Sequence, residues 1–292
     1  MRARAVGTLG SGNHFLEIGK IDRIHNERVA KTFGLTHTGQ IIIMIHSGSR
    51  GLGHQVCSDY LQVMDRAMHK YKIVLPDREL ACAPSSSQEA LEYYQAMACA
   101  VNYAFANRQA MTHWVRESFE QVFKKSAESF GLNLVYDVAH NIAKIEEHEI
   151  DGKRRKVWVH RKGATRSFGI GHQEVPADYR SVGQPVLIPG TMGTSSWVMV
   201  GTVDAGEHSF GSTAHGAGRI MSRSAAKRQL KGVEVREKLR KKGIIIRTAS
   251  QEVIAEEASE AYKDVDRVAE VSDALYLALK VARLIPMAVI KG

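Results

Sequence analysis

The sequence predicts an α+β fold, with mixed and antiparallel strands flanked by helices. Helical periodicity covers about residues 55–130, and short strand-like segments separated by Gly, Pro and Asp follow beyond residue 130. The chain has 292 residues and 44% hydrophobic content, which is ample for a core. We therefore expect a single domain over residues 1–292, with a helical insertion over about residues 55–130.

The first half of the chain predicts a turn, a strand and two long helices. Residues 8–18 form a Gly-rich turn that leads into a short apolar segment, and Ile41–His46 has the apolar character of a buried strand. Apolar residues at helical spacing predict helices over Gln55–His69 and Ser87–Phe130. The segment Ser85–Gln88 is a candidate capped start for the second helix.

The second half predicts short strands with three further helices. Expected strands are Asn133–Val138, Lys156–His160, Pro185–Ile188, Ser196–Val203 and Ile244–Thr248. Expected helices cover about Ile220–Leu230, Asp264–Ala269 and Ser272–Val281.

Composition and charge restrict the class of protein. The longest apolar runs are well short of the roughly 20 residues that a membrane span needs, and we expect a cytoplasmic protein without a signal peptide. The three cysteines lack C-x-x-C spacing, so we expect reduced thiols. The net charge of +9 comes partly from a basic stretch from Arg219 to Arg247, which is either a solvated face or a surface for a polyanion such as nucleic acid.

Four histidines lie beside Gly, Asn or Arg, in settings that packing alone does not require. They occur in the segments Asn13-His14-Phe15-Leu16-Glu17, His46-Ser-Gly-Ser-Arg50, His140-Asn141 and His215-Gly216-Ala217-Gly218-Arg219. Imidazole is the commonest metal ligand and also a nitrogen nucleophile. Histidines at the ends of separate segments could converge on one metal or a pair of metals, or each could simply cap its own strand.

Three segments, one of them the His215 segment, suit a phosphate or nucleotide. His215 is expected on a glycine-rich turn that opens a basic helix, where negative charge is favoured and a neutral imidazole could attack a triphosphate. Lys162–Arg166 is a basic, flexible turn that could be a lid over a phosphate. Pro189–Ser196 is a Gly/Ser/Thr loop between two expected strands, and it lacks the Walker A pattern.

The motifs and their order along the chain resemble those of the RtcB family of RNA-splicing ligases. The resemblance runs from near Ala5 to the terminal Lys291-Gly292. The resemblance is carried by the histidine segments together with Gly10–Asn13, Tyr136–Asn141 and Pro189–Met192. It implies an RtcB-like fold and a GTP- and manganese-dependent joining of an RNA 2′,3′-cyclic phosphate or 3′-phosphate end to a 5′-hydroxyl end, in tRNA splicing or RNA repair. It further implies that His215 takes GMP from GTP, passes it to the RNA 3′-phosphate, and that the 5′-hydroxyl then displaces GMP.

The resemblance also implies roles for individual residues. Two manganese ions would have His14, His46 and His140 among their ligands; three histidines alone would suit zinc equally well. GMP would be surrounded by Asn13, His14, Phe15, Leu16, Glu17, His140, Asn141, Pro189, Gly190, Thr191, Met192, Ser196, His215, Gly216, Ala217, Gly218, Tyr262 and Lys291. Arg50 and Lys162 would contact RNA phosphate or the triphosphate. The implied partners are GTP, RNA in the form of tRNA exon halves or broken ends, and an archease-type activator of a monomeric ligase.

One part of the family pattern lies outside this sequence. Family members carry an Asp-x-x-Cys segment upstream, whose carboxylate and thiolate complete the metal site. We therefore expect an N-terminally truncated family member with poor metal affinity and impaired ligation. Two other functions stay open, namely a metal-dependent phosphoesterase, which would not accumulate covalent GMP, and a non-catalytic RNA-binding fragment, whose binding would depend steeply on salt.

Overall fold

The computed structural model describes residues 6–77, 80–248 and 250–292. Residue contacts divide the chain into two compact units. The first contains the described residues up to Gly10 and Ser47–Leu132, and the second contains Ser11–His46 and Asn133–Gly292. Helices and a largely antiparallel sheet confirm the predicted α+β class. The single-domain organisation with a helical insertion stays a prediction.

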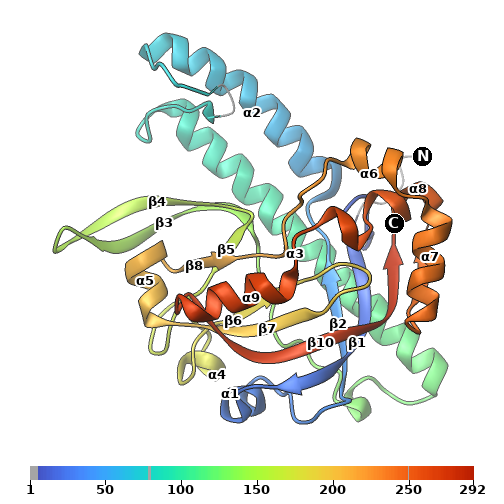
Figure 1. Ribbon diagram of the computed structural model, residues 1–292. Coiled ribbons are helices and arrows are strands. Elements are labelled where there is room, and N and C mark those ends of the chain that lie inside the picture. Colours follow the sequence, from blue (N-terminus) through green and yellow to red (C-terminus); the bar gives the residue numbers. More distant parts are fainter. Residues whose placement is uncertain (1–5, 78–79, 249) are drawn as a thin grey trace. The chain divides into compact units, whose positions relative to one another are not determined.

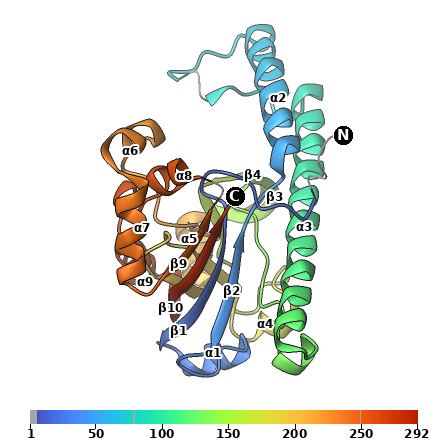
Figure 2. The same cartoon turned by 90° about the vertical axis from the view of Figure 1, so that its right-hand side faces the viewer.

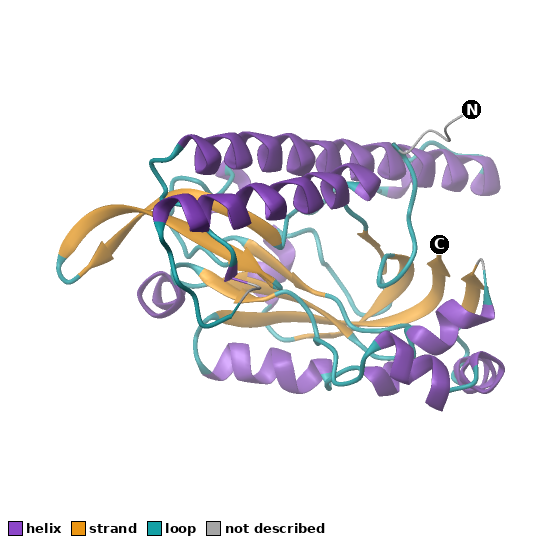
Figure 3. Ribbon diagram, turned by 90° about the horizontal axis from the view of Figure 1, so that it is seen from above, coloured by secondary structure: helices purple, strands orange, loops and turns teal. Residues whose placement is uncertain are grey.

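The first unit is built on two long helices, α2 (Arg50–Tyr71) and α3 (Gln88–Phe123), with a short 3-10 helix, η2 (Glu128–Phe130). Figure 3 shows α2 and α3 side by side. The predicted cap is confirmed, because Ser87 Oγ accepts a hydrogen bond from the Ala90 amide at 3.2 Å. The helix α3 ends before the predicted Phe130, since Lys124 adopts a left-handed conformation (φ 56°). No helix in the described ranges is long and apolar enough to cross a membrane.

The second unit contains a six-stranded sheet in the order β2–β1–β10–β7–β6, with β9 paired to β10. The strands are β1 (Phe15–Ile24), β2 (Ile41–His46), β6 (Pro185–Ile188), β7 (Ser196–Gly201), β9 (Ile245–Thr248) and β10 (Ala278–Lys291). All of its pairs are antiparallel except β9 with β10. Figure 2 shows β2, β1, β10 and β9 next to one another. The long strand β10 is therefore central to the sheet.

Two smaller sheets and several short helices complete the second unit. The strands are β3 (Asn141–Ile150) with β4 (Lys153–Lys162), and β5 (Ala164–Arg166) with β8 (Ser212–Ala214). The helices are α1 (Glu27–Thr32), α4 (Ala177–Arg180), α5 (Val203–Ser209), α6 (Arg223–Gln229), α7 (Gly232–Lys241), α8 (Gln251–Glu256), η3 (Ser259–Ala261) and α9 (Val265–Ala274). Figure 1 shows the β3–β4 hairpin projecting beyond the ends of β6 and β7.

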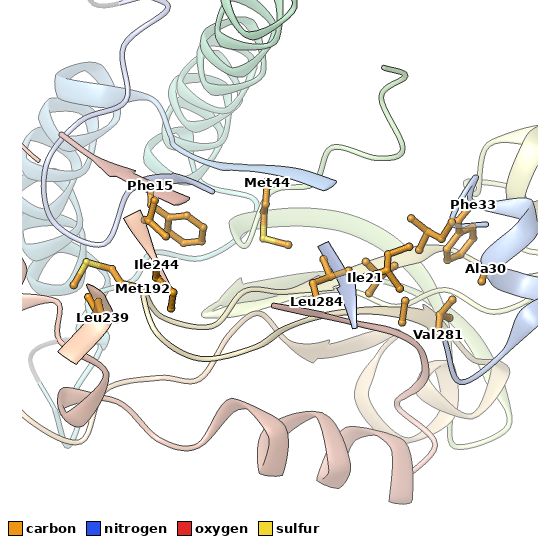
Figure 4. Packing of buried hydrophobic residues seen from close by; sticks show 14 of the residues in the cluster. Phe15, Ile21, Ala30, Phe33, Met44, Met192, Leu239, Ile244, Val281 and Leu284 are labelled. Atoms are coloured by element: carbon orange, nitrogen blue, oxygen red, sulfur yellow. The ribbon is translucent and has the colours of Figure 1, made fainter. Parts of the chain in front are cut away.

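Alternating side chains of the sheet enter two hydrophobic clusters. Val198 and Val200 of β7 pack with Phe15, Met44 and Leu284 in the larger cluster, part of which is drawn in Figure 4. Their neighbours Trp197 and Met199 pack in a second cluster with Val265 and Ala269 of α9. Successive side chains of a strand point to opposite faces. The sheet is therefore buried on both faces around β7.

Two predicted elements are wrong. The segment Ser272–Val281 was expected to be helical, but α9 ends at Ala274 and β10 begins at Ala278, where it pairs with Gly201 of β7. The segment Asn133–Val138 was expected to be a strand, but it has no strand pairing in the described ranges. Its Val135 carbonyl instead accepts a hydrogen bond from the Tyr179 hydroxyl at 2.7 Å.

Other boundaries are shifted by local capping. The strand β7 ends at Gly201, before the predicted Val203, because Thr202 caps α5 and accepts from the Ala205 amide at 3.1 Å. The helix α6 begins at Arg223 rather than near Ile220, since Ser222 is its N-cap. The predicted strands Ile41–His46 and Pro185–Ile188 are confirmed, and Lys156–His160 lies within β4.

Candidate active site

Four histidines of the second unit come together at the ends of strands, and we call them the histidine cluster: His14, His46, His140 and His215. The Nε2 atoms of His46 and His140 are 3.0 Å apart. The ring centre of His14 lies 6.2 Å from that of His46, and the ring centre of His215 lies 4.3 Å from that of His140. The predicted convergence of the histidines is therefore present in the fold.

The local settings of these histidines differ in part from the prediction. His46 ends β2, as expected, but His140 precedes β3 and does not follow a strand. His215 follows β8, and α6 begins only at Arg223. The expected position of His215 at a helix N-terminus is therefore wrong, because the glycine-rich turn continues to the Ser222 cap.

Burial favours the neutral imidazole at His46, His140 and His215. Burial, with a contribution from the neighbouring histidines, holds the pKa of His46 well below its ordinary value. Burial lowers the pKa of His140 to about 4 and also lowers the pKa of His215. A neutral imidazole has an available ring-nitrogen lone pair, so these side chains can be metal ligands or nucleophiles at neutral pH.

The cluster retains polar atoms that the protein itself does not satisfy. Nδ1 of His140 and Nδ1 of His215 are buried and have no hydrogen-bond partner within the described part of the chain. A buried polar atom without a partner costs free energy, so its presence suggests an additional ligand or ion.

The geometry of His46 and His140 fits two ligands of one metal ion. Two nitrogens bound about 2.1 Å from an ion at a right angle are about 3.0 Å apart, which matches the Nε2–Nε2 distance of 3.0 Å. No set of three or more His, Cys, Asp or Glu side chains in the described ranges is close enough to hold an ion. The structure thus assembles a pair of ligands, and His14 as a third ligand stays a prediction.

The segment around Gly163 contacts the candidate nucleophile. The Gly163 amide donates to the His140 carbonyl at 3.0 Å and to Asn141 Oδ1 at 3.3 Å. A Cβ at Gly163, whose φ is 68°, would lie 3.3 Å from Cε1 of His215. Lys162 ends β4 and Ala164 begins β5, so the predicted flexible turn is wrong, whereas a contact of this segment with phosphate stays a prediction. Strand pairing fixes this segment beside His215.

The loop Pro189–Ser196 connects β6 and β7 as predicted and is held by its own polar groups. Gly190 donates its amide to Ser196 Oγ at 3.0 Å, and Thr191 donates its amide to Thr194 Oγ1 at 2.8 Å. A Cβ at Gly216 would lie 3.2 Å from the Pro189 carbonyl oxygen, which brings the loop beside the residue that follows His215. This proximity is compatible with a common binding site.

Several predicted nucleotide residues contribute core packing. Phe15, Met192 and Ala217 are buried in the hydrophobic clusters. Leu16 lies in β1 opposite Ile45 of β2. Their side chains therefore have a structural role that is sufficient to explain their hydrophobic character.

Glu17 is a buried carboxyl group in the middle of the sheet. It is 2% exposed, and burial raises its pKa to about 8, although a hydrogen bond with Ser196 acts in the opposite direction. The carboxyl is therefore largely protonated at neutral pH. A protonated carboxyl can both donate and accept a hydrogen bond, which suits an edge-on contact with a base.

A buried carboxylate missed in the sequence organises the neighbouring side chains. Glu257 is 1% exposed, accepts from the Tyr262 hydroxyl, and pairs with Arg219 at 3.3 Å and Lys291 at 3.6 Å. We call these four residues the Glu257 cluster. Tyr262 and Lys291 are predicted nucleotide residues, and no sequence signal distinguishes Glu257 from the exposed Glu252 and Glu260 nearby.

The cations of the Glu257 cluster make further contacts, one within the cluster and one with the turn before β1. Arg219 donates to the Tyr262 hydroxyl at 2.8 Å, with its guanidinium 4.7 Å from the ring centre. Lys291 donates to the Gly12 carbonyl at 3.1 Å, beside Asn13 in the turn before β1. Burial lowers the pKa of Lys291 to about 8.

The remaining predicted phosphate contacts lie on different elements. Lys162 is exposed at the end of β4. Arg50 belongs to the first unit, where it begins α2 and donates from Nε to Thr8 Oγ1 at 3.3 Å. A Cβ at Gly10 would collide with the Arg50 guanidinium, and Gly10 has a φ of 91°, so only glycine suits this position.

Six of the eleven lysines and arginines in the basic stretch from Arg219 to Arg247 form ion pairs in the described part of the chain. Its ion pairs are Arg219–Glu257, Arg223–Glu256, Lys227–Glu256, Lys231–Glu234, Lys238–Glu260 and Arg240–Glu237. Much of the charge is therefore balanced locally, which favours the solvated-face interpretation over a polyanion surface.

Comparison with known proteins adds a sequence relationship to this geometry. A family described as tRNA-splicing ligase RtcB matches residues 1–292. Proteins named tRNA-splicing ligase RtcB from Methanococcus maripaludis and Archaeoglobus fulgidus are 58% and 57% identical over 98% of this chain. The chain spans 60% and 59% of their lengths, and 32% of a similarly named Pyrococcus abyssi protein that is 56% identical over 99% of the chain. Matches over nearly the whole chain give no support to the expectation of impaired activity.

Proposed function

Since the chain belongs to the tRNA-splicing ligase RtcB family, we propose that it carries the guanylate-transfer site of a ligase that joins RNA ends. The substrates are an RNA 3′-phosphate or 2′,3′-cyclic phosphate end and a 5′-hydroxyl end, with GTP as the energy source. The observation that most supports this proposal is the neutral His215 ring, packed 4.3 Å from the His140 ring. His140 is in turn paired with His46.

The first chemical step is assigned to His215. The lone pair of one ring nitrogen forms a P–N bond to the α-phosphorus of GTP, and the P–O bond to pyrophosphate breaks with its electron pair leaving on pyrophosphate. Burial supports this role because it lowers the pKa of His215 and keeps the lone pair available. A cyclic phosphate end is first hydrolysed by water to the 3′-phosphate. An oxygen of the 3′-phosphate then takes GMP as the P–N bond to His215 breaks, and the 5′-hydroxyl attacks the activated 3′-phosphate, loses its proton and releases GMP.

The metal expected for this family is manganese, with His46 and His140 as the ligands that the geometry supports. When bound, the ion would neutralise charge on the phosphate oxygens and thereby reduce repulsion of the nucleophile. His14 is an expected third ligand. The unsatisfied Nδ1 atoms of His140 and His215 are consistent with a site that is completed by added groups.

The nucleotide is proposed to lie between the histidine cluster and the Glu257 cluster. Glu17 and Ser196 supply hydrogen-bonding groups at the sheet, and the amides of Pro189–Ser196 suit polar parts of the nucleotide. Tyr262 and Lys291 are held by Glu257. An archease-type activator, a monomeric state and a cytoplasmic location stay predictions.

The test is covalent labelling of the chain with α-³²P-GTP and Mn²⁺. We expect an acid-labile, alkali-stable adduct, because a phosphoramidate has this stability, and we expect its loss in His215→Ala. His208→Ala is the matched control, since His208 is exposed on α5. Labelling that survives His215→Ala would overturn the nucleophile, and no labelling of the unaltered chain would overturn guanylate transfer by this chain. A phosphoesterase would release product without accumulating the adduct.

A further inference from the structure

The β3–β4 hairpin starts at the candidate active site and extends away from it. It is paired without interruption from Asn141 opposite Lys162 to Ile150 opposite Lys153. Ten residues at about 3.3 Å each give a length of about 33 Å. At its base, the Gly163 amide donates to the His140 carbonyl at 3.0 Å. Figure 1 shows the other end of the hairpin far from the main sheet.

The inner face of the hairpin is fixed to the rest of the second unit. Arg161 is fully buried and donates two hydrogen bonds to Glu146, at 2.7 and 2.9 Å. It also donates to the Phe210 carbonyl at 2.8 Å and to Ser212 Oγ at 2.9 Å. The His148 ring packs 5.2 Å from the Phe210 ring. These contacts connect the hairpin to β8, the strand that leads to His215.

The outer face presents a row of side chains along β4. Alternate residues of a strand share a face, so one row contains Arg154, Lys156, Trp158, His160 and Lys162. Trp158 is half-buried and the other four are exposed. Cations interspersed with an aromatic ring are the combination that binds the phosphates and bases of a single nucleic-acid strand. This row ends directly beside Gly163, which contacts His215.

The tip carries a run of exposed positive charge. Lys153, Arg154, Arg155 and Lys156 are consecutive and exposed. In the described part of the chain only Lys156 of these four has an ion pair, with Glu147 at 3.8 Å. In α6 and α7, by comparison, four of the seven lysines and arginines have a carboxylate partner, for example Lys227 with Glu256 at 2.9 Å.

The strand β3 contributes acidic side chains that limit this charge. Glu147 and Glu149 are exposed on the same face as the β4 row, and Asp151 lies in the turn. Exposed lysines and arginines of the hairpin number five (153, 154, 155, 156 and 162), against these three carboxylates. The excess is positive and concentrated on β4.

We propose that the basic tip and the β4 row form a binding surface for the phosphate backbone of one RNA strand, whose 3′ end reaches His215. This inference rests on the proposed function, because it takes RNA as the substrate. The tip would bind RNA about 33 Å from the site of joining. Phosphate contacts of this kind position a nucleic acid without reading its sequence.

The experiment compares two triple variants that lose the same charge. Lys153→Ala/Arg154→Ala/Arg155→Ala removes unpaired cations of the tip, and Lys231→Ala/Lys238→Ala/Arg240→Ala removes paired cations of α7. Binding of a 20-nucleotide RNA with a 3′-phosphate is measured by fluorescence anisotropy at several salt concentrations. We expect the tip variant to bind about tenfold more weakly, with a salt slope shallower by about 2, since each single-strand phosphate contact contributes about 0.7. We expect the α7 variant to bind like the unaltered chain.

A shorter RNA and the labelling reaction separate the possible outcomes. A trinucleotide with a 3′-phosphate cannot reach the tip, so we expect the tip variant to bind it normally. Equal weakening by the two variants, or no weakening by the tip variant, would overturn the proposed surface. Labelling of His215 by GTP is measured separately and does not involve RNA. If GTP does not label the unaltered chain, the proposed function is contradicted. The RNA-binding measurements decide the role of the tip independently of that result.

Discussion

The histidine cluster and the Glu257 cluster lie in the same unit but reach electrostatic balance in different ways. In the Glu257 cluster, the buried carboxylate, the tyrosine hydroxyl and the two cations all have partners. In the histidine cluster, buried Nδ1 atoms of His140 and His215 lack partners in the described chain. The difference indicates that one side of the site is complete in the folded chain, whereas the other is completed by what binds to it.

The largest expected effect is a loss of stability when Glu257 is removed from the Glu257 cluster. Glu257→Ala leaves Lys291 and Arg219 without their buried counter-charge, so we expect a loss of about 3–5 kcal/mol in the free energy of unfolding. Chemical denaturation measures this loss. Glu260→Ala is the control, because Glu260 pairs with Lys238 at the surface, and we expect it to cost at most about 1 kcal/mol. Similar small losses in the two variants would contradict the proposed difference between the clusters.

The next largest effect is the stabilisation that a metal ion gives when it binds to the histidine cluster. At a Mn²⁺ concentration 100-fold above the dissociation constant, we expect about 2.7 kcal/mol of stabilisation of the unaltered chain. His46→Ala and His140→Ala each remove one of two paired ligands and should abolish this gain, whereas His208→Ala should retain it. Thermal unfolding with Mn²⁺, and in parallel with Zn²⁺, measures the gain. A full gain in both ligand variants would exclude the pair as the metal site.

The smallest effect concerns pH and Glu17 of β1, the strand that lies between β2 and β10. Its pKa is about 8 in the folded chain, against an ordinary value of 4.5, so between these pH values the folded state binds one more proton than the unfolded state. Stability from this group is therefore present at low pH and is lost as the pH rises, by about 1 kcal/mol per unit between pH 5.5 and 7.5.

Glu17→Gln tests this pH dependence, since glutamine resembles the protonated carboxyl and cannot ionise. The difference in unfolding free energy between the unaltered chain and the variant should change with pH over that window. Titration of the other groups is common to both proteins and cancels in the difference. A difference that is constant from pH 5.5 to 7.5 would show that Glu17 is ionised throughout.

Local patterns in the sequence were sufficient for several parts of the fold and site. The apolar run Ile41–Ile45 followed by His46 predicts a strand with a histidine at its end, and the structure has this strand. The serine run before α3 predicts its cap, and Ser87 is that cap. Such features depend on neighbouring residues, so a single sequence contains the necessary information.

Features that depend on distant partners were not predictable in this way. Ala278–Val281 contains good helix formers, but it becomes strand because β7 and β1 pair with β10 along its length. Long-range pairing outweighs local preference in such a strand. Glu257 belongs to an acidic segment typical of a surface helix, and it is buried among partners from other segments, namely Arg219, Tyr262 and Lys291. The residue roles taken from the family remain predictions.

Arg161 has a mechanical consequence for the hairpin. A two-stranded arm joined to the protein only through its chain connections would pivot about them. The bonds from one guanidinium to Phe210 and Ser212, which lie outside the hairpin, resist such rotation, and Ser212 is three residues from His215. These bonds hold the tip of the hairpin at a constant distance from His215. The hairpin can therefore set the length of RNA that lies between its tip and the nucleophile.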